Sequence, residues 1–215
     1  MAQNFLVIFK RKTIPKEKWP KGVVVSANEK GYIDADMVCF WLENIWRKRK
    51  NSFFCKKSVL IYDSSRPHLT DEVKQKVKKF SDLVVIPGGL TSKLQPLDLS
   101  VNKSFKDRMR EKWENWMVNG YHSFTKSGSM KRASYAVVCQ WIDECWGEVT
   151  ENCIKNGFNA ANICDYPTDP SNTVITEVNE SDNESEEEID SQIPANFSDL
   201  FELFNIESDE EFYGF

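Results

Sequence analysis

The chain has 215 residues, 40% of them hydrophobic, and a formal net charge of -5. That is enough for one domain of ordinary size with additional material. No apolar run approaches the roughly 18 residues of a membrane-spanning helix, which excludes an integral membrane protein. The N-terminal apolar stretch precedes its lysines, the reverse of a signal peptide, and this order predicts an intracellular protein.

The charge is divided unevenly along the chain. Residues 1–135 hold 27 Lys and Arg against 13 Asp and Glu, whereas residues 136–215 hold 1 against 20. Such a split indicates either a half that faces nucleic acid with an acidic appendage, or lysines that only solvate helix faces. The six cysteines lack the close pairing of zinc fingers or redox motifs, and we expect reduced, mostly buried thiols.

Hydrophobic patterning predicts strands at residues 5–9, 22–27, 58–63 and 83–87. Helices are expected in the 37–46 region, capped by Asp34 or Asp36, and then over 70–80, 99–118, 132–147 and 151–157. Alternating strands and helices predict an α/β fold with a largely parallel sheet. We expect a folded domain over residues 1–160 and a disordered acidic tail over 161–215.

Two aspartates mark the expected carboxyl edge of that sheet. Asp63 ends an apolar strand, and Asp98 stands at a helix entry 35 positions later. Functional groups gather at the carboxyl ends of strands in open α/β sheets, and Mg²⁺ prefers carboxylate oxygens. The alternative, favoured by spacing alone, is that Asp63 starts a turn and Asp98 caps a helix.

The sequence segments around these aspartates resemble those of a known family. VLIYDSSRPHLTDEV and VVIPGGLTSKLQPLDLSVNKSFKDRMR resemble the DDE endonuclease domain of pogo/Tigger-type transposases, within the Tc1/mariner group. The upstream segment VIFKRKTIPKEKWPKGVVVSANEKGYIDADMVCFWL and the later KRASYAVVCQWIDECW are similar to it as well. Together they cover about residues 4–160.

The resemblance implies an RNase H-like (DDE/integrase-type) fold and metal-dependent DNA cleavage and joining. Asp63 and Asp98 would be catalytic acids and ligands of Mg²⁺ or Mn²⁺. His68 completes the D-x-x-x-x-H element, and it either orients a carboxylate or phosphate or is simply a histidine satisfied in a loop.

The family's first acid, however, is expected before the VIFK segment, and no Asp or Glu precedes Glu17. We therefore expect a core that lacks its leading strand or strands, and no cleavage by this chain alone. The upstream helix-turn-helix region is also missing from the sequence. An exposed sheet edge would follow, and with it poor solubility of the isolated chain.

Basic residues suggest how DNA would be bound. The candidate phosphate contacts are Lys10, Arg11, Lys12, Arg47, Lys48, Arg49, Lys103, Lys106 and Arg110. The two short basic runs would serve equally as nuclear localisation signals or as solvated faces. Trp113 and Trp116 are expected to pack in the core rather than to stack on bases, and we expect a nuclear protein.

The acidic tail offers a second interpretation. Its apolar residues alternate with acids, as in disordered segments that bind partners: Phe197, Leu200, Phe201, Leu203 and Phe204. Ser181, Ser185 and Ser208 stand among acids and are candidate phosphorylation sites. The alternative to a DNA-binding transposase domain is thus a noncatalytic, domesticated protein that recruits partners through its tail.

Overall fold

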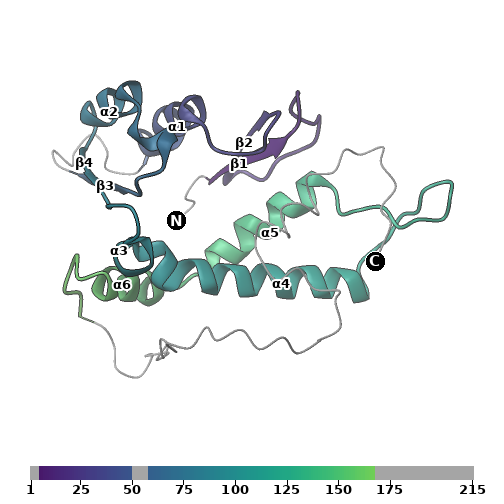
Figure 1. Cartoon of the computed structure of the whole chain (residues 1–215). Coiled ribbons are helices and arrows are strands. Elements are labelled where there is room, and N and C mark those ends of the chain that lie inside the picture. Colours follow the sequence, from purple (N-terminus) through teal and green to yellow (C-terminus); the bar gives the residue numbers. More distant parts are fainter. Residues whose placement is uncertain (1–4, 50–57, 168–215) are drawn as a thin grey trace.

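The computed structural model describes residues 5–49 and 58–167 (Figure 1). Its strands are β1 (Phe5–Lys10), β2 (Val23–Asn28), β3 (Val59–Tyr62) and β4 (Asp82–Val85). Its longer helices are α1 (Ala35–Trp41), α2 (Asp71–Lys78), α4 (Asn102–Asn119), α5 (Tyr135–Gly147) and α6 (Glu151–Ala160). Four short segments complete it: the π-helical η1 (Leu42–Trp46) and η3 (Leu97–Val101), the 3-10 segment η2 (Arg66–Leu69) and α3 (Thr91–Leu94).

The strands pair in parallel, as the alternation with helices predicted. β1 lies beside β2 with Phe5 opposite Val23, and β3 lies beside β4 with Val59 opposite Asp82. Within the described ranges, however, these are two separate two-stranded sheets and not the single sheet that we expected. Each pair packs on its own helices, so the chain is a mixed α/β protein with two small sheets (Figure 1).

The first core joins β1 and β2 to α4 and α5. It is rich in aromatic residues: Phe9 and Trp141 are buried, and Trp113 and Trp116 pack against them from α4. The Trp116 ring meets that of Trp141 edge-on at 6.0 Å. This confirms that the two α4 tryptophans are core residues. Buried Cys139 also belongs here, and its burial raises the pKa of the thiol to about 12, as expected of an inert thiol.

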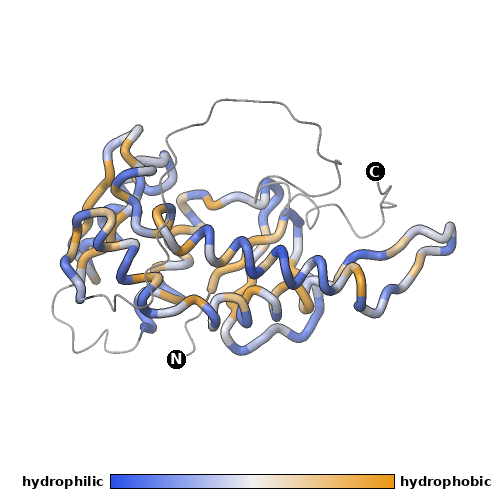
Figure 2. Tube along the Cα trace, turned by 90° about the horizontal axis from the view of Figure 1, so that it is seen from below, coloured by the Kyte–Doolittle hydropathy of each residue, from blue (hydrophilic) through white to orange (hydrophobic). Residues whose placement is uncertain are grey.

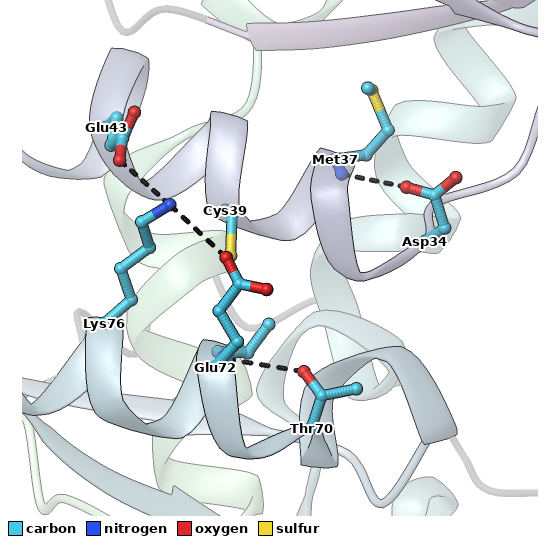
Figure 3. Close-up of polar contacts among 8 residues, drawn as sticks. Asp34, Met37, Cys39, Glu43, Thr70, Glu72 and Lys76 are labelled. Carbon is cyan, nitrogen blue, oxygen red and sulfur yellow. Dashed lines mark hydrogen bonds and ion pairs between the residues drawn. The ribbon is translucent and has the colours of Figure 1, made fainter.

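The second core joins β3 to α1, η1 and α2. Its buried centre is mainly aliphatic, with Leu42, Val73 and Val77 fully buried against Val38 and Leu60. Trp41, Trp46 and Tyr62 pack around this centre. Figure 3 shows the polar rim above it, where Lys76 of α2 pairs with Glu43 of η1 at 2.9 Å. This ion pair links α2 to η1, which continues α1.

Side-chain caps start both helices of this half. Asp34, not Asp36, caps α1 by accepting a hydrogen bond from the Met37 backbone N–H at 2.9 Å (Figure 3). Thr70 caps α2 by accepting one from the Val73 N–H at 3.4 Å. Because an N-cap oxygen satisfies an otherwise unpaired amide, each cap fixes the residue at which its helix begins.

No helix of the described residues has the length and apolar character that a bilayer crossing requires. The acidic residues beyond 167, with their aromatic and serine candidates, lie outside the described residues, as does Lys50 of the second basic run.

Candidate nuclease site

Asp63 is the first residue after β3, and a short loop folds around it. Its Oδ1 accepts a hydrogen bond from the Ser65 backbone N–H at 3.1 Å, the pattern of an Asx-turn. The same oxygen lies 2.6 Å from His68 Nδ1. Because η2 begins at Arg66 and runs into the Thr70 cap, the loop brings His68 back to the strand end.

These contacts set the ionisation of Asp63. Partial burial works to raise the pKa of the carboxyl. The hydrogen bonds from the Ser65 side chain and backbone and from His68 outweigh it, so that the pKa lies below its ordinary value. Asp63 is therefore a carboxylate at neutral pH, as a metal ligand must be.

The state of Asp63 also decides the tautomer of His68. A carboxylate only accepts hydrogen bonds, so Nδ1 must carry the proton that is shared with Oδ1. Ser65 Oγ, 2.9 Å from the same nitrogen, completes the cluster. The Tyr62 ring stacks on the imidazole with centroids 4.3 Å apart, so the ring plane is fixed as well.

The loop after β4 lies against the loop after β3. The backbone N–H of Ile86 donates to the Tyr62 carbonyl at 2.7 Å, which continues the ladder past both strand ends. A Cβ at Gly88 would stand 3.4 Å from Ser64 Oγ. The chain that leads to Asp98 therefore departs from beside Asp63.

Asp98 is held differently, in the π-helical segment η3. It is exposed, and its side chain accepts a hydrogen bond from Asn102 Nδ2 one turn later. Helix α6 fixes η3 from behind: Ser100 Oγ donates to the Cys153 carbonyl at 2.8 Å. A Cβ at Gly157 would come within 2.5 Å of the Pro96 carbonyl oxygen, so only glycine fits this approach.

The described residues offer oxygen donors of the kind that a hard cation prefers, from two separate elements. Gln95 Oε1 is buried without a hydrogen-bond partner in the described part of the chain, three residues before Asp98. Asp63 and His68 form one contact pair, and no described hydrogen bond joins either of them to Asp98. Within residues 5–49 and 58–167, no three His, Cys, Asp or Glu side chains stand in metal-binding reach of one another.

A family model described as DDE superfamily endonuclease matches residues 3–158. The chain belongs to this family. The match includes β3 with its Asp63 loop, η3 with Asp98, and all six numbered α-helices through Phe158 of α6. This match confirms the resemblance that the two sequence segments around Asp63 and Asp98 indicated.

Its relatives in this endonuclease family are named for pogo elements. Two proteins called "Pogo transposable element with KRAB domain", from Mus musculus and Homo sapiens, are each 32% identical over 158 residues. That is 73% of this chain and 26% of theirs. The Homo sapiens "Pogo transposable element with ZNF domain" is 26% identical over 235 residues, 98% of this chain and 16% of its own. The chain thus spans about a quarter or less of the curated relatives it matches.

No solved structure matches the chain. The family assignment therefore rests on sequence alone.

The basic residues that the sequence singled out divide into two groups. Three of the four arginines lie on the protein's own aromatic rings, and the fourth is ion-paired. Arg49 stands 3.9 Å from the Trp46 ring centroid and donates to Ser58 Oγ at 2.7 Å. Arg47 lies over Phe80, Arg11 over Tyr135, and Arg110 pairs with Asp107. The lysines are exposed: Lys10, Lys12, Lys48, Lys103 and Lys106.

Three residues that support the candidate acids were not predicted from the sequence: Tyr62, Ser65 and Gly157. Ser65 was detectable, since an Asp followed two positions later by Ser is a common Asx-turn pattern. The stacking of Tyr62 and the close fit of Gly157 had no local signal, because both depend on segments that meet only in the folded chain.

Proposed function

We propose that this chain is a transposase-derived DDE domain that binds DNA and holds Asp63 and Asp98 as two inherited carboxylate ligands for Mg²⁺ or Mn²⁺. The single observation that carries the proposal is the Asp63 loop. Its carboxylate is ionised, locked through Oδ1 by Ser65 and His68, and placed at the carboxyl end of a parallel strand.

In this proposal the protein groups have distinct roles. The Ser65 N–H and His68 contact Asp63 Oδ1, so Asp63 would offer its other oxygen, Oδ2, to a cation, and Asp98 would be the second carboxylate. His68 is a positioning residue, because it holds a ligand by a hydrogen bond in the way that outer-sphere partners fix metal ligands. Bound divalent ions supply a Lewis acid for phosphodiester chemistry in such sites.

The overall arrangement that we propose is RNase H-like, with β3 and β4 as adjacent parallel strands of its sheet. The support is the parallel register of β3 and β4 and the position of the acids after them. The exposed lysines are the first candidates for phosphate contacts, with the arginines acting mainly to shape the surface. A DNA substrate and the lysine-rich runs together support a nuclear location.

We further propose that this chain alone does not cleave DNA. Asp63 and Asp98 supply two acids, whereas the DDE arrangement uses three and a two-metal centre needs carboxylates on both ions. The chain would bind DNA without processing it.

A plasmid assay tests both parts of the proposal. We expect the purified chain to shift DNA in a gel and to lose this shift steeply between about 50 and 200 mM salt. With Mg²⁺ or Mn²⁺ it should nick supercoiled plasmid no faster than an Asp63→Asn variant. Asp82→Asn, an exposed acid on β4, is the matched control. Nicking that disappears only in Asp63→Asn would contradict inactivity, and a lack of any gel shift would overturn DNA binding.

A recruiting protein is the second candidate. The observation that favours it is the alternation of aromatic and acidic residues near the C-terminus, in FSDLFELFNIESDEEF. This function needs no Asp63. A partner captured equally by the wild-type chain and Asp63→Asn, and lost when Phe201 and Phe204 are changed to serine, would support it.

A further inference from the structure

The chain after α4 forms a projecting hairpin, which we call the arm and define as residues 120–131. Figure 1 and Figure 2 both show it extending away from the helices. Phe124 and Met130 form an antiparallel bridge, and the Lys131 N–H donates to the Ser123 carbonyl at 2.7 Å. The Thr125 N–H donates to the Ser129 carbonyl at 2.8 Å, and Gly128, at a φ of +92°, closes the turn.

The root of the arm is anchored. Gly120 lies so close to α4 that a Cβ there would stand 2.4 Å from the Trp116 carbonyl oxygen. The His122 ring packs edge-on against Trp116 at 4.6 Å, and its Nε2 lies 3.1 Å from the Met117 carbonyl. Since Trp116 belongs to the aromatic core, the arm is fastened to the body at its base.

Its aromatic side chains are nevertheless uncovered. Tyr121 is fully exposed, with a relative accessibility of 104%, and Phe124 is 61% exposed. Val118, just before the arm, is 79% exposed. Isolated exposed apolar residues are common on proteins. Here two exposed rings stand on a segment with no fully buried residue, so their burial is not what stabilises the arm.

The charge around these rings has one sign. No Asp or Glu occurs from residue 115 to residue 142, in a chain where 28% of residues are charged. Lys126 and Lys131 are exposed, and neither has an ion-pair partner among the described residues. The same segment carries four hydroxyl residues: Ser123, Thr125, Ser127 and Ser129.

We propose that the arm is a binding surface for single-stranded DNA, with Tyr121 and Phe124 as stacking platforms and Lys126 and Lys131 as phosphate contacts. The inference rests on the proposed DNA binding and adds a site to it. Uncovered rings between lysines match what unpaired bases on a charged backbone require. A protein partner could also cover the two rings, and its binding would not depend on whether a DNA probe carries bases.

The test uses the full chain and three DNA probes of equal length: a single strand, the same strand with abasic positions, and a duplex. Fluorescence anisotropy measures affinity for each. The wild-type chain should prefer the ordinary strand to the abasic one, because only the former can stack. A lost stack is expected to lower affinity at least about fivefold, so Tyr121→Ser with Phe124→Ser should remove that preference, whereas Tyr121→Trp should keep it.

The lysines have a separate readout. Lys126→Gln with Lys131→Gln should weaken binding to both single strands and flatten the salt dependence by about 1.4 in the log–log slope, since each phosphate contact on a single strand contributes about 0.7. Lys78→Gln with Lys79→Gln, two exposed lysines of the α2 region, is the control and should change neither quantity for the single strands.

The outcomes separate the two proposals. If the aromatic and the lysine variants of the arm both bind duplex and single strand as the wild-type chain does, the arm site is overturned. The proposed DNA binding would remain. Failure of the wild-type chain to bind any probe would overturn both. Light scattering on the same samples gives the remaining outcome: a dimer that becomes a monomer in Tyr121→Ser with Phe124→Ser would assign the arm to self-association and overturn the proposal.

Discussion

The two halves of the molecule are stabilised in different ways, and the two candidate acids lie on different elements. The β3–β4 half rests on a small aliphatic core with Leu42, Val73 and Val77 at its centre. The β1–β2 half rests on an aromatic core shared with α4 and α5. Asp63 ends a strand of the first core, whereas Asp98 precedes α4, which packs in the second. A metal site that uses both acids therefore depends on two separately packed bodies keeping their relative positions.

Truncation of the aliphatic core should have the largest effect. Leu42 is fully buried, and Leu42→Ala is expected to lower the free energy of unfolding by about 2–5 kcal/mol, since it removes buried methyl groups and leaves a cavity. Met109→Ala in the aromatic core, at 2% exposure, should cost a similar amount. Urea unfolding followed by circular dichroism measures both.

The comparison of these two variants is informative in itself. If the halves unfold independently, Leu42→Ala shifts only one of two transitions, and if they are coupled, both variants shift a single transition. Ile14→Ala, at 48% exposure, is the control and should change stability by no more than about 0.5 kcal/mol. A Leu42→Ala variant as stable as Ile14→Ala would contradict the aliphatic core.

The packing of η3, which carries Asp98, against α6 can be disturbed without changing Asp98 itself. A Cβ at Gly157 would stand 2.5 Å from the Pro96 carbonyl oxygen and 2.6 Å from Ser100 Oγ, so Gly157→Ala should force α6 away from η3 at a cost of about 1–3 kcal/mol. Gly147→Ala is the matched control, because nothing lies within 4 Å of its Cβ and alanine favours a helix by up to about 1 kcal/mol. Equal melting temperatures for the two variants would contradict the close approach of α6.

The entry of α2, which follows the Asp63 loop, should be sensitive to its cap. Thr70→Ala removes the hydroxyl that accepts the Val73 N–H, and we expect a loss of about 1 kcal/mol. Thr70→Ser keeps the oxygen and should recover most of that loss. Thermal unfolding of the three proteins measures the difference, and no difference between alanine and serine would show that the cap is not formed.

The smallest expected effect is the pH dependence that Asp63 contributes. Because the folded-state pKa lies below the ordinary value near 3.8, the stabilisation is complete above that value. It is lost as the pH falls from there through the folded pKa. In Asp63→Asn this part of the acid destabilisation should be missing. Stability curves of both proteins measured from pH 6 down to pH 2 test it, and parallel curves would contradict the lowered pKa.

Much of this architecture could be read from the sequence, and the rest depends on contacts between distant segments. The apolar run before Asp63, the cap at Thr70 and the long helix after Asp98 all follow from local patterns. The division into two sheets does not, because each apolar run shows only that a strand is buried and not which helix buries it.

The basic runs show the same limit. The sequence marked Arg49 as a candidate phosphate contact, and the folded chain places its guanidinium on Trp46 and Ser58. Composition gives the charge of a segment but not the direction of its side chains. We therefore predict phosphate contacts for the exposed lysines first, and not for the arginines that pack on rings or pair with Asp107.

Titration of the chain with Mn²⁺ tests the central claim most directly. The electron paramagnetic resonance signal of free Mn²⁺ reports how much ion the protein binds. We predict one site in the wild-type chain that is weakened in both Asp63→Asn and Asp98→Asn and retained in Asp82→Asn, which would place both acids on one ion. Binding that is unaffected by Asp63→Asn, or lost equally in Asp82→Asn, would contradict the shared site.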